Sequence, residues 1–147
     1  MKSLLIGMFM KISKSLCATI TIICSALLLT SCATTPSADI QMKRAELERT
    51  TPICSDEKDC AAKWDAAQLW IVHNSGFKLQ TTTNVLLQTY NATGGSPSIA
   101  VQVTKEPLGG GKYKLAVQIS CDNIFGCVPN QWDAALNFNN TVSAVKP

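Results

Sequence analysis

The chain has few of the residues on which common enzyme active sites depend. It contains a single histidine, His73, so any Ser-His-Asp or Cys-His arrangement would have to use it. It has neither the Gly-x-Ser-x-Gly pattern of a nucleophile elbow nor a Cys-x-x-Cys redox pair. His73 stands near the expected end of a helix, where the helix dipole explains a histidine. The sequence therefore predicts no catalytic residue, and an enzyme is the least favoured class.

Charged residues are also scarce, at 16 % of the chain. Three of the thirteen Lys and Arg residues precede position 32, which leaves ten basic and ten acidic residues in 32–147. A chain of balanced charge has no electrostatic basis for attracting nucleic acid. The Gly-rich segment Lys105–Lys112 is followed by a strand pattern rather than by the helix of a phosphate loop, so it is interpreted as a hairpin connection. We therefore expect no nucleic-acid partner and no cofactor.

The N-terminal segment carries a targeting signal. A start containing Lys2, Lys11 and Lys14 is followed by an uncharged, largely apolar run over 15–29 and then by Leu29-Thr30-Ser31-Cys32. The run is shorter than the roughly 20 residues of a bilayer span. The arrangement resembles the signal of bacterial lipoproteins, in which an aliphatic residue and two small residues precede the cysteine that is acylated. The alternative is an uncleaved anchor helix, and no later run is long and apolar enough to span a bilayer.

This resemblance implies where the protein is located. It assigns residues 1–31 to a signal peptide, lipid to Cys32, and 32–53 to the acylated N-terminus and a flexible tether, which contains a short, loosely held helix over 39–49. Several acyl chains would make membrane attachment effectively permanent. Ala33 stands where an aspartate often retains such lipoproteins at the inner membrane, so the periplasmic face of the outer membrane is expected. Residues 54–147 would form one small periplasmic domain.

Four cysteines remain after Cys32, in two pairs with the spacing Cys-x5-Cys: Cys54, Cys60, Cys121 and Cys127. An even number in an exported chain implies disulfides. Three connectivities are open, and two local bridges are preferred because each spacing can close a short loop. A zinc site, with His73 as an optional ligand, and a redox pair are the weaker alternatives, so no metal is expected.

Hydrophobic periodicity predicts the element order α-β-β-β-β-α. Apolar residues recur at helical spacing from Cys60 to Ile71, after a cap at Ser55, and again from Trp132 to Val142. Alternating segments near 77–82, 85–90, 98–104 and 112–121 predict a four-stranded antiparallel meander. One face of these strands is apolar, so a two-layer α+β domain is expected, with both helices on one face of the sheet and disulfide staples.

Two surfaces are candidate contact sites. Ile124 and Phe125 lie in the Cys121–Cys127 loop, where they would form a rigid apolar knob or fold inward to plug the core. The polar face of the sheet carries amides, lysines and one tyrosine that suit a glycan or an extended peptide, although a solvated face explains them equally. The residues singled out on this face are Lys78, Gln80, Gln88, Tyr90, Gln102, Lys112 and Lys114.

The Cys-x5-Cys pairs, the two Trp-Asp-Ala-Ala tetrapeptides at 64–67 and 132–135, and the loop Cys-Asp-Asn-Ile-Phe-Gly-Cys resemble small uncharacterised lipoproteins of Gram-negative bacteria. That resemblance implies no activity. The expected function is a non-enzymatic binding or structural module that contacts an envelope protein or peptidoglycan. The alternative is a periplasmic enzyme inhibitor that uses the same loop. The expected contacts are Ile124, Phe125, Tyr90, Lys112 and Lys114.

Overall fold

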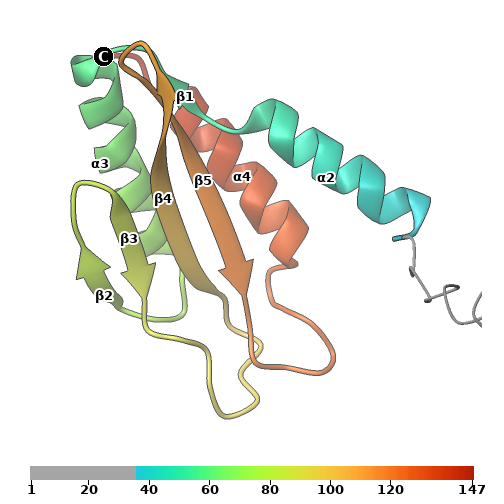
Figure 1. Ribbon diagram of the computed structural model, residues 1–147. Helices are drawn as coiled ribbons and strands as arrows, with labels where there is room; N and C mark the ends of the chain where they lie inside the picture. Colours follow the sequence, from blue (N-terminus) through green and yellow to red (C-terminus); the bar gives the residue numbers. More distant parts are fainter. Residues whose placement is uncertain (1–35) are drawn as a thin grey trace, which may run out of the picture. The chain divides into compact units, whose positions relative to one another are not determined.

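The computed structural model describes residues 36–147, so the expected signal peptide (1–31) and the lipidated Cys32 lie outside the described residues. Residues Ser37–Pro147 form one compact unit. Within it are α2 (Ala38–Thr50), β1 (Ile53–Cys54), α3 (Glu57–Asn74), β2 (Leu79–Thr82), β3 (Leu86–Thr89), β4 (Ala100–Gly109), β5 (Lys112–Ser120) and α4 (Gln131–Ser143) (Figure 1). No helix of this part of the chain is long and apolar enough to cross a membrane.

The strands form one antiparallel sheet in the order β1-β5-β4-β3-β2. Strands β2 to β5 are the expected meander. The two longest, β4 and β5, pair from Ala100 opposite Ser120 to Gly109 opposite Lys112. All three glycines of 109–111 have positive φ angles, which glycine adopts without steric cost. The segment Lys105–Lys112 is therefore a hairpin, as expected, and not a phosphate loop.

The fifth strand, β1, was not expected from the sequence. Its Ile53 and Cys54 pair with Lys114 and Tyr113 of β5. The preceding Pro52 extends this contact, because its carbonyl oxygen accepts a hydrogen bond of 2.9 Å from the backbone N–H of Leu115. A strand of two residues is too short to show an alternating pattern, so periodicity could not reveal it.

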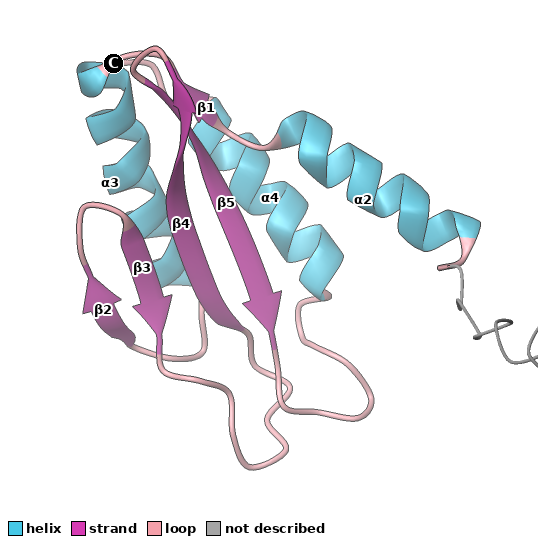
Figure 2. Ribbon diagram, in the orientation of Figure 1, coloured by secondary structure: helices cyan, strands magenta, loops and turns pink. Residues whose placement is uncertain are grey.

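Helices α3 and α4 cover the same face of the sheet, as expected (Figure 2). Trp70 of α3 meets Phe138 of α4 edge-on, with ring centroids 5.2 Å apart, and its Nε1–H donates to Asn137 Oδ1 at 2.8 Å. Leu69 lies outside the buried stripe of α3 and is 59 % exposed. The core comprises Trp64, Ala67, Trp70, Ile71, Leu87, Ile99, Val101, Val103, Leu115, Ala134, Phe138 and Val142.

Helix α2 belongs to the compact unit, which therefore begins before the expected domain start near Cys54. None of its residues is buried, but it contacts α4. The contact runs through Asn139, whose Nδ2 donates to Leu47 O at 3.1 Å and to Thr50 Oγ1 at 3.0 Å. Asn139 is only 2 % exposed. One buried amide thus joins α2 to the domain, and the thin apolar stripe of this segment gave no indication of that contact.

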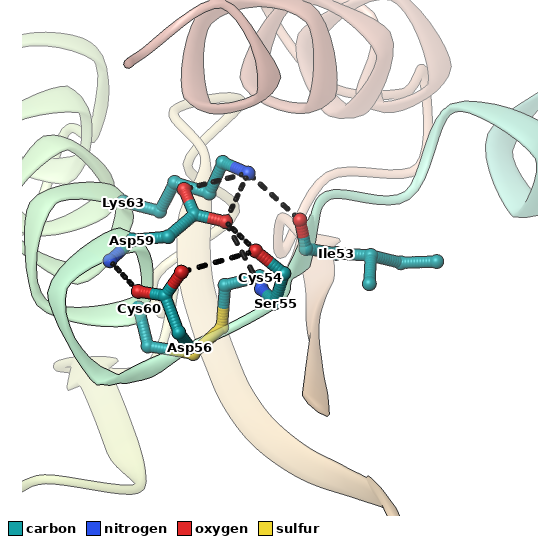
Figure 3. Close-up of polar contacts among 7 residues, drawn as sticks. All are labelled: Ile53, Cys54, Ser55, Asp56, Asp59, Cys60 and Lys63. Carbon is teal, nitrogen blue, oxygen red and sulfur yellow. Dashed lines mark hydrogen bonds and ion pairs between the residues drawn. A yellow bond between two sulfur atoms is a disulfide. The ribbon is translucent and has the colours of Figure 1, made fainter. Parts of the chain in front are cut away.

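The start of α3 is held by a set of polar contacts (Figure 3). Asp56, rather than the expected Ser55, caps the helix, since its Oδ1 accepts from the backbone N–H of Asp59 at 2.9 Å. The Asp59 carboxylate accepts from the backbone N–H of Ser55 at 3.0 Å and lies 2.9 Å from Lys63 Nζ. Lys63 also donates to Ile53 O at 2.8 Å. The hydrogen bond from Lys63, followed by that from the Ser55 backbone, lowers the pKa of Asp59 below its ordinary value.

Candidate functional site

Both expected local disulfides are confirmed. Cys54 bonds to Cys60 with a Cα–Cα distance of 4.9 Å, and Cys121 bonds to Cys127 with a Cα–Cα distance of 5.5 Å. All four thiols are therefore used in bridges and are not free to hold zinc. The second bridge closes the loop that carries the expected apolar contacts.

The tip of this loop is a tight turn over 123–126. The Gly126 N–H donates to Asn123 O at 3.2 Å, and Asn123 Oδ1 accepts from the Phe125 N–H at 2.9 Å. An asparagine side chain that bonds to the backbone two residues on is a common way to fix such a turn. The two central residues are Ile124 and Phe125, which are 92 % and 93 % exposed. They form an outward knob, and the interpretation of Phe125 as a plug of the core is wrong.

A second loop, over 91–98, braces the disulfide loop. Asp122 Oδ2 accepts from the Gly95 N–H at 3.0 Å, and the Asp122 N–H donates to Ser96 O at 3.1 Å. Asn123 Nδ2 donates to Gly95 O. Figure 1 shows both loops at the end of the sheet opposite the β4–β5 hairpin. The knob is thus ordered before any partner arrives, so binding through it would lose little conformational entropy.

Exposed apolar side chains are common on proteins, and this domain has others besides Ile124 and Phe125. Leu69 and Val72 on α3 are 59 % and 61 % exposed, and they lie on a helix surface. Ile124 and Phe125 differ in being almost fully exposed, adjacent, and held at the tip of a cross-linked turn. Their exposure, adjacency and fixed position make these two residues the candidate contact site.

The structure does not bring all five expected contacts together. Lys112 begins β5 at the hairpin, and Lys114 Nζ lies 2.9 Å from Glu106 Oε2. A strand rises about 3.3 Å per residue, so Lys112 is roughly 25 Å from the disulfide loop that follows β5. Tyr90 follows β3, at the loop end of the sheet, and is 54 % exposed. Only Tyr90 therefore lies at the same end as the knob.

Lys114 is also engaged within the fold. The hydrogen bond that Lys114 donates to Glu106 lowers the pKa of Glu106 below the ordinary value of a glutamate. A second hydrogen bond, from Thr104 at 2.9 Å, acts in the same direction. Both members of the Lys114–Glu106 pair are close to half exposed, at 41 % and 44 % for the side chains, so the pair adds little to stability. We assign neither Lys112 nor Lys114 to the knob site.

The alignment of three glutamines in a row on the open face of the sheet was not expected from the sequence. Gln88 of β3 stands opposite Gln102 of β4, which stands opposite Gln118 of β5. Together they line a hollow of about 390 Å³. Alternation predicts Gln88 and Gln102 on the polar face, but only the strand register aligns them with Gln118.

Beside the hairpin lies a groove of about 700 Å³, lined in part by Trp64, Lys105 and Tyr113. Lys105 Nζ lies 5.8 Å from the ring centroid of Trp64 and 5.1 Å from that of Tyr113. The aromatic faces that could attract a cationic ligand are thereby occupied within the fold.

His73 lies exposed in the last turn of α3, where it was expected. Among residues 36–147, no group of three or more His, Cys, Asp or Glu side chains is placed to hold a metal ion. Comparisons with protein-family models, with curated proteins and with solved structures found no match. Function is therefore inferred from the geometry of this chain.

Proposed function

We propose that this protein is a membrane-anchored lipoprotein of the bacterial envelope whose domain binds a protein partner through Ile124 and Phe125. The observation that carries the proposal is the exposure of these two side chains, 92 % and 93 %, on a turn fixed by a disulfide and by the loop 91–98. Burying two such side chains in a partner's pocket would contribute on the order of 3–6 kcal/mol before the costs of association. The domain is then a binding or structural module, and the knob is its anchor.

The lipid anchor rests on the sequence Leu29-Thr30-Ser31-Cys32 and its flanking segments. Two disulfides support an oxidising compartment, because such bonds persist in exported proteins and are rare in the cytosol. With Ala33 after the acylated cysteine, the periplasmic face of the outer membrane is the proposed location. Metabolic labelling with a fatty-acid analogue tests this: the wild type should be labelled and fractionate with outer membranes, and Cys32→Ala should be unlabelled.

The contact site is tested by placing a photo-crosslinking amino acid at position 125 in living cells. Position 72 on α3 is the matched control, since Val72 is also an exposed apolar residue. One dominant protein adduct from position 125, absent from position 72 and competed by excess unlabelled wild-type protein but not by Phe125→Asp, is the expected result. Adducts of the same identity from both positions, or none from position 125, would remove the knob as the contact site.

A second candidate function is inhibition of an enzyme by insertion of the same loop into its active-site cleft. The specific observation in its favour is the cross-linked turn, whose rigidity suits a competitive inhibitor. The two functions separate once a partner is captured. An inhibitor would abolish the partner's activity at stoichiometric concentration and Phe125→Asp would not, whereas a structural module would leave that activity unchanged.

A further inference from the structure

The glutamine row has a regular geometry that crosses four strands. Thr81 of β2 stands opposite Gln88, so the row continues as Thr81, Gln88, Gln102 and Gln118 across neighbouring strands. Adjacent strands are about 4.8 Å apart, and residues in register project from the same face. The three glutamine side chains therefore lie side by side, about 4.8 Å apart from strand to strand.

The row opens into a hollow because the pairing of β3 with β4 ends there. Toward the loop end of the sheet, Gln88 and Gln102 are the last residues of β3 and β4 that pair with each other. Beyond that point the Val101 N–H donates to Thr89 Oγ1 at 2.9 Å, so a side chain replaces the usual strand carbonyl as acceptor. Ala100, with its small side chain, lines the hollow beside the amides.

The three amides have no partner of their own. Within residues 36–147, the side chains of Gln88, Gln102 and Gln118 make no hydrogen bond to another protein group. Each amide offers two N–H donors and one carbonyl acceptor, so the row presents both kinds of group in alternation. Gln88 and Gln102 are half-buried, which restricts their rotamers and lowers the entropy that binding would remove.

The hollow also carries no charge. Its remaining polar side chains are those of Thr89, Asn91 and Ser120. A lining of amides and hydroxyls without a charged group gives no basis for holding a polyanion or a basic peptide. An extended peptide would instead add to a free edge of the sheet, whereas this row lies on the face of β3, β4 and β5.

We propose that the glutamine row binds a neutral glycan chain that carries acetamido groups. The glutamine N–H groups donate to hydroxyl and acetyl oxygens of the sugar, and the glutamine carbonyls accept from its hydroxyl and amide hydrogens. The site is separate from the knob and does not depend on the proposed protein partner.

The test uses the full chain in detergent, with N-acetylated chitotetraose as the soluble probe and purified peptidoglycan sacculi as the insoluble one. We expect chitotetraose at millimolar concentration to shift the side-chain amide NMR signals of Gln88, Gln102 and Gln118. Gln102→Met, close in length and facing the hollow, should weaken binding about three- to tenfold, the size expected for one lost hydrogen-bonding side chain. The matched control is Gln80→Met, an exposed glutamine of β2 outside the hollow, which should bind as the wild type does.

Three results would overturn the proposal. The first is the absence of any shift in the wild-type amide signals together with the absence of cosedimentation with sacculi, which needs no variant to interpret. The second is equal weakening by Gln102→Met and Gln80→Met. The third is self-association of the wild type that Gln102→Met abolishes without any effect of glycan, since a second copy would then cover the face. Retention of glycan binding by Phe125→Asp would support two separate sites.

Discussion

Two aspartate–lysine pairs in this protein have the same spacing along a helix but opposite surroundings. In α2, Asp39 and Lys43 are 3.4 Å apart, with side chains 66 % and 41 % exposed. In α3, Asp59 and Lys63 are 2.9 Å apart, with side chains 9 % and 11 % exposed. Substituting each aspartate by asparagine therefore compares the cost of losing a buried ion pair with the cost of losing an exposed one at the same i, i+4 spacing.

The expected costs differ several-fold. Asp59→Asn replaces the carboxylate beside the buried Lys63 ammonium with a neutral amide and weakens the bonds from Ser55, so Lys63 loses its ion-pair partner. Removing one partner of such a pair costs about 3–5 kcal/mol, and asparagine keeps one side-chain oxygen, which favours the lower end. An exposed pair at this spacing contributes about 0.3–0.5 kcal/mol. For a domain of this size the melting temperature should fall by more than roughly 10 °C for Asp59→Asn and by only a few degrees for Asp39→Asn.

The same carboxylate predicts how the loss depends on pH. Lys63 and the Ser55 backbone lower the pKa of Asp59 in the folded protein, so the folded value lies below the unfolded one. The stability that Asp59 supplies is then fully present above the unfolded value, near pH 4, and is lost as the pH falls through the folded value. The difference between wild type and Asp59→Asn should be constant between about pH 5 and 8 and should shrink below about pH 4.

Thermal unfolding of the full chain in detergent, followed by far-UV circular dichroism at pH 7 and at pH 3, measures both effects. Equal shifts of melting temperature for the two substitutions at pH 7 would refute the claim that burial sets the cost. A large loss for Asp59→Asn that persists unchanged at pH 3 would show that the shape of the side chain matters and its charge does not.

Three further substitutions have distinct expected outcomes. Gly76→Ala would press a Cβ against that of Ser98 and should cost about 2 kcal/mol by chemical denaturation, with partial recovery when Ser98→Gly is added; no loss would mean that the two segments can separate. Phe125→Asp should leave the melting temperature within about 2 °C of the wild type, and a large drop would place its ring in the core. Thr89→Val removes the acceptor of the Val101 N–H and should cost about 1–3 kcal/mol; an unchanged midpoint would show that water satisfies this donor.

The elements that sequence could predict are those whose burial repeats with a fixed period. Cys60, Trp64, Ala67 and Ile71 follow the helical period, and all four are buried in α3. The strands β2 to β5 alternate over four or more residues and are separated by turn residues, which defines an antiparallel meander. Periodicity is a local property, so it can be read without any knowledge of the partner elements.

The elements that were missed depend on contacts between distant residues. Strand β1 exists because Ile53 and Cys54 meet β5, and α2 is joined to the domain by Asn139, which follows it by about ninety positions. Neither contact leaves an apolar pattern in the segment itself. The glutamine row was missed for the same reason. Alternation within one strand shows which face a side chain lies on, but the alignment of the three glutamines depends on the register between three strands.

The orientation of Ile124 and Phe125 could not be decided from the loop sequence for a related reason. The outward and the inward orientation are both compatible with the Cys121–Cys127 disulfide. In the structure, Asn123 bonds to the Phe125 backbone within the turn and to Gly95 O in the loop 91–98. Asn123 uses its side-chain oxygen to fix the turn and its side-chain nitrogen to bond to the other loop, so the turn is held at its base. The composition of the loop is compatible with either orientation, and only the structure shows that both side chains point outward.

The two disulfides have the same sequence separation but stabilise different parts of the molecule. Because each closes a loop of the same length, each restricts the unfolded chain to the same extent, and their difference must arise in the folded state. Cys54 and Cys60 are 0 % and 3 % exposed and join β1 to the first turn of α3, beside Asp59 and Lys63. Cys121 and Cys127 are partly buried, and Cys127 packs against the core while the residues between them stay outside it. The first bridge therefore lies within the packed interior, whereas the second ties the base of the turn that carries Ile124 and Phe125 to the edge of the core.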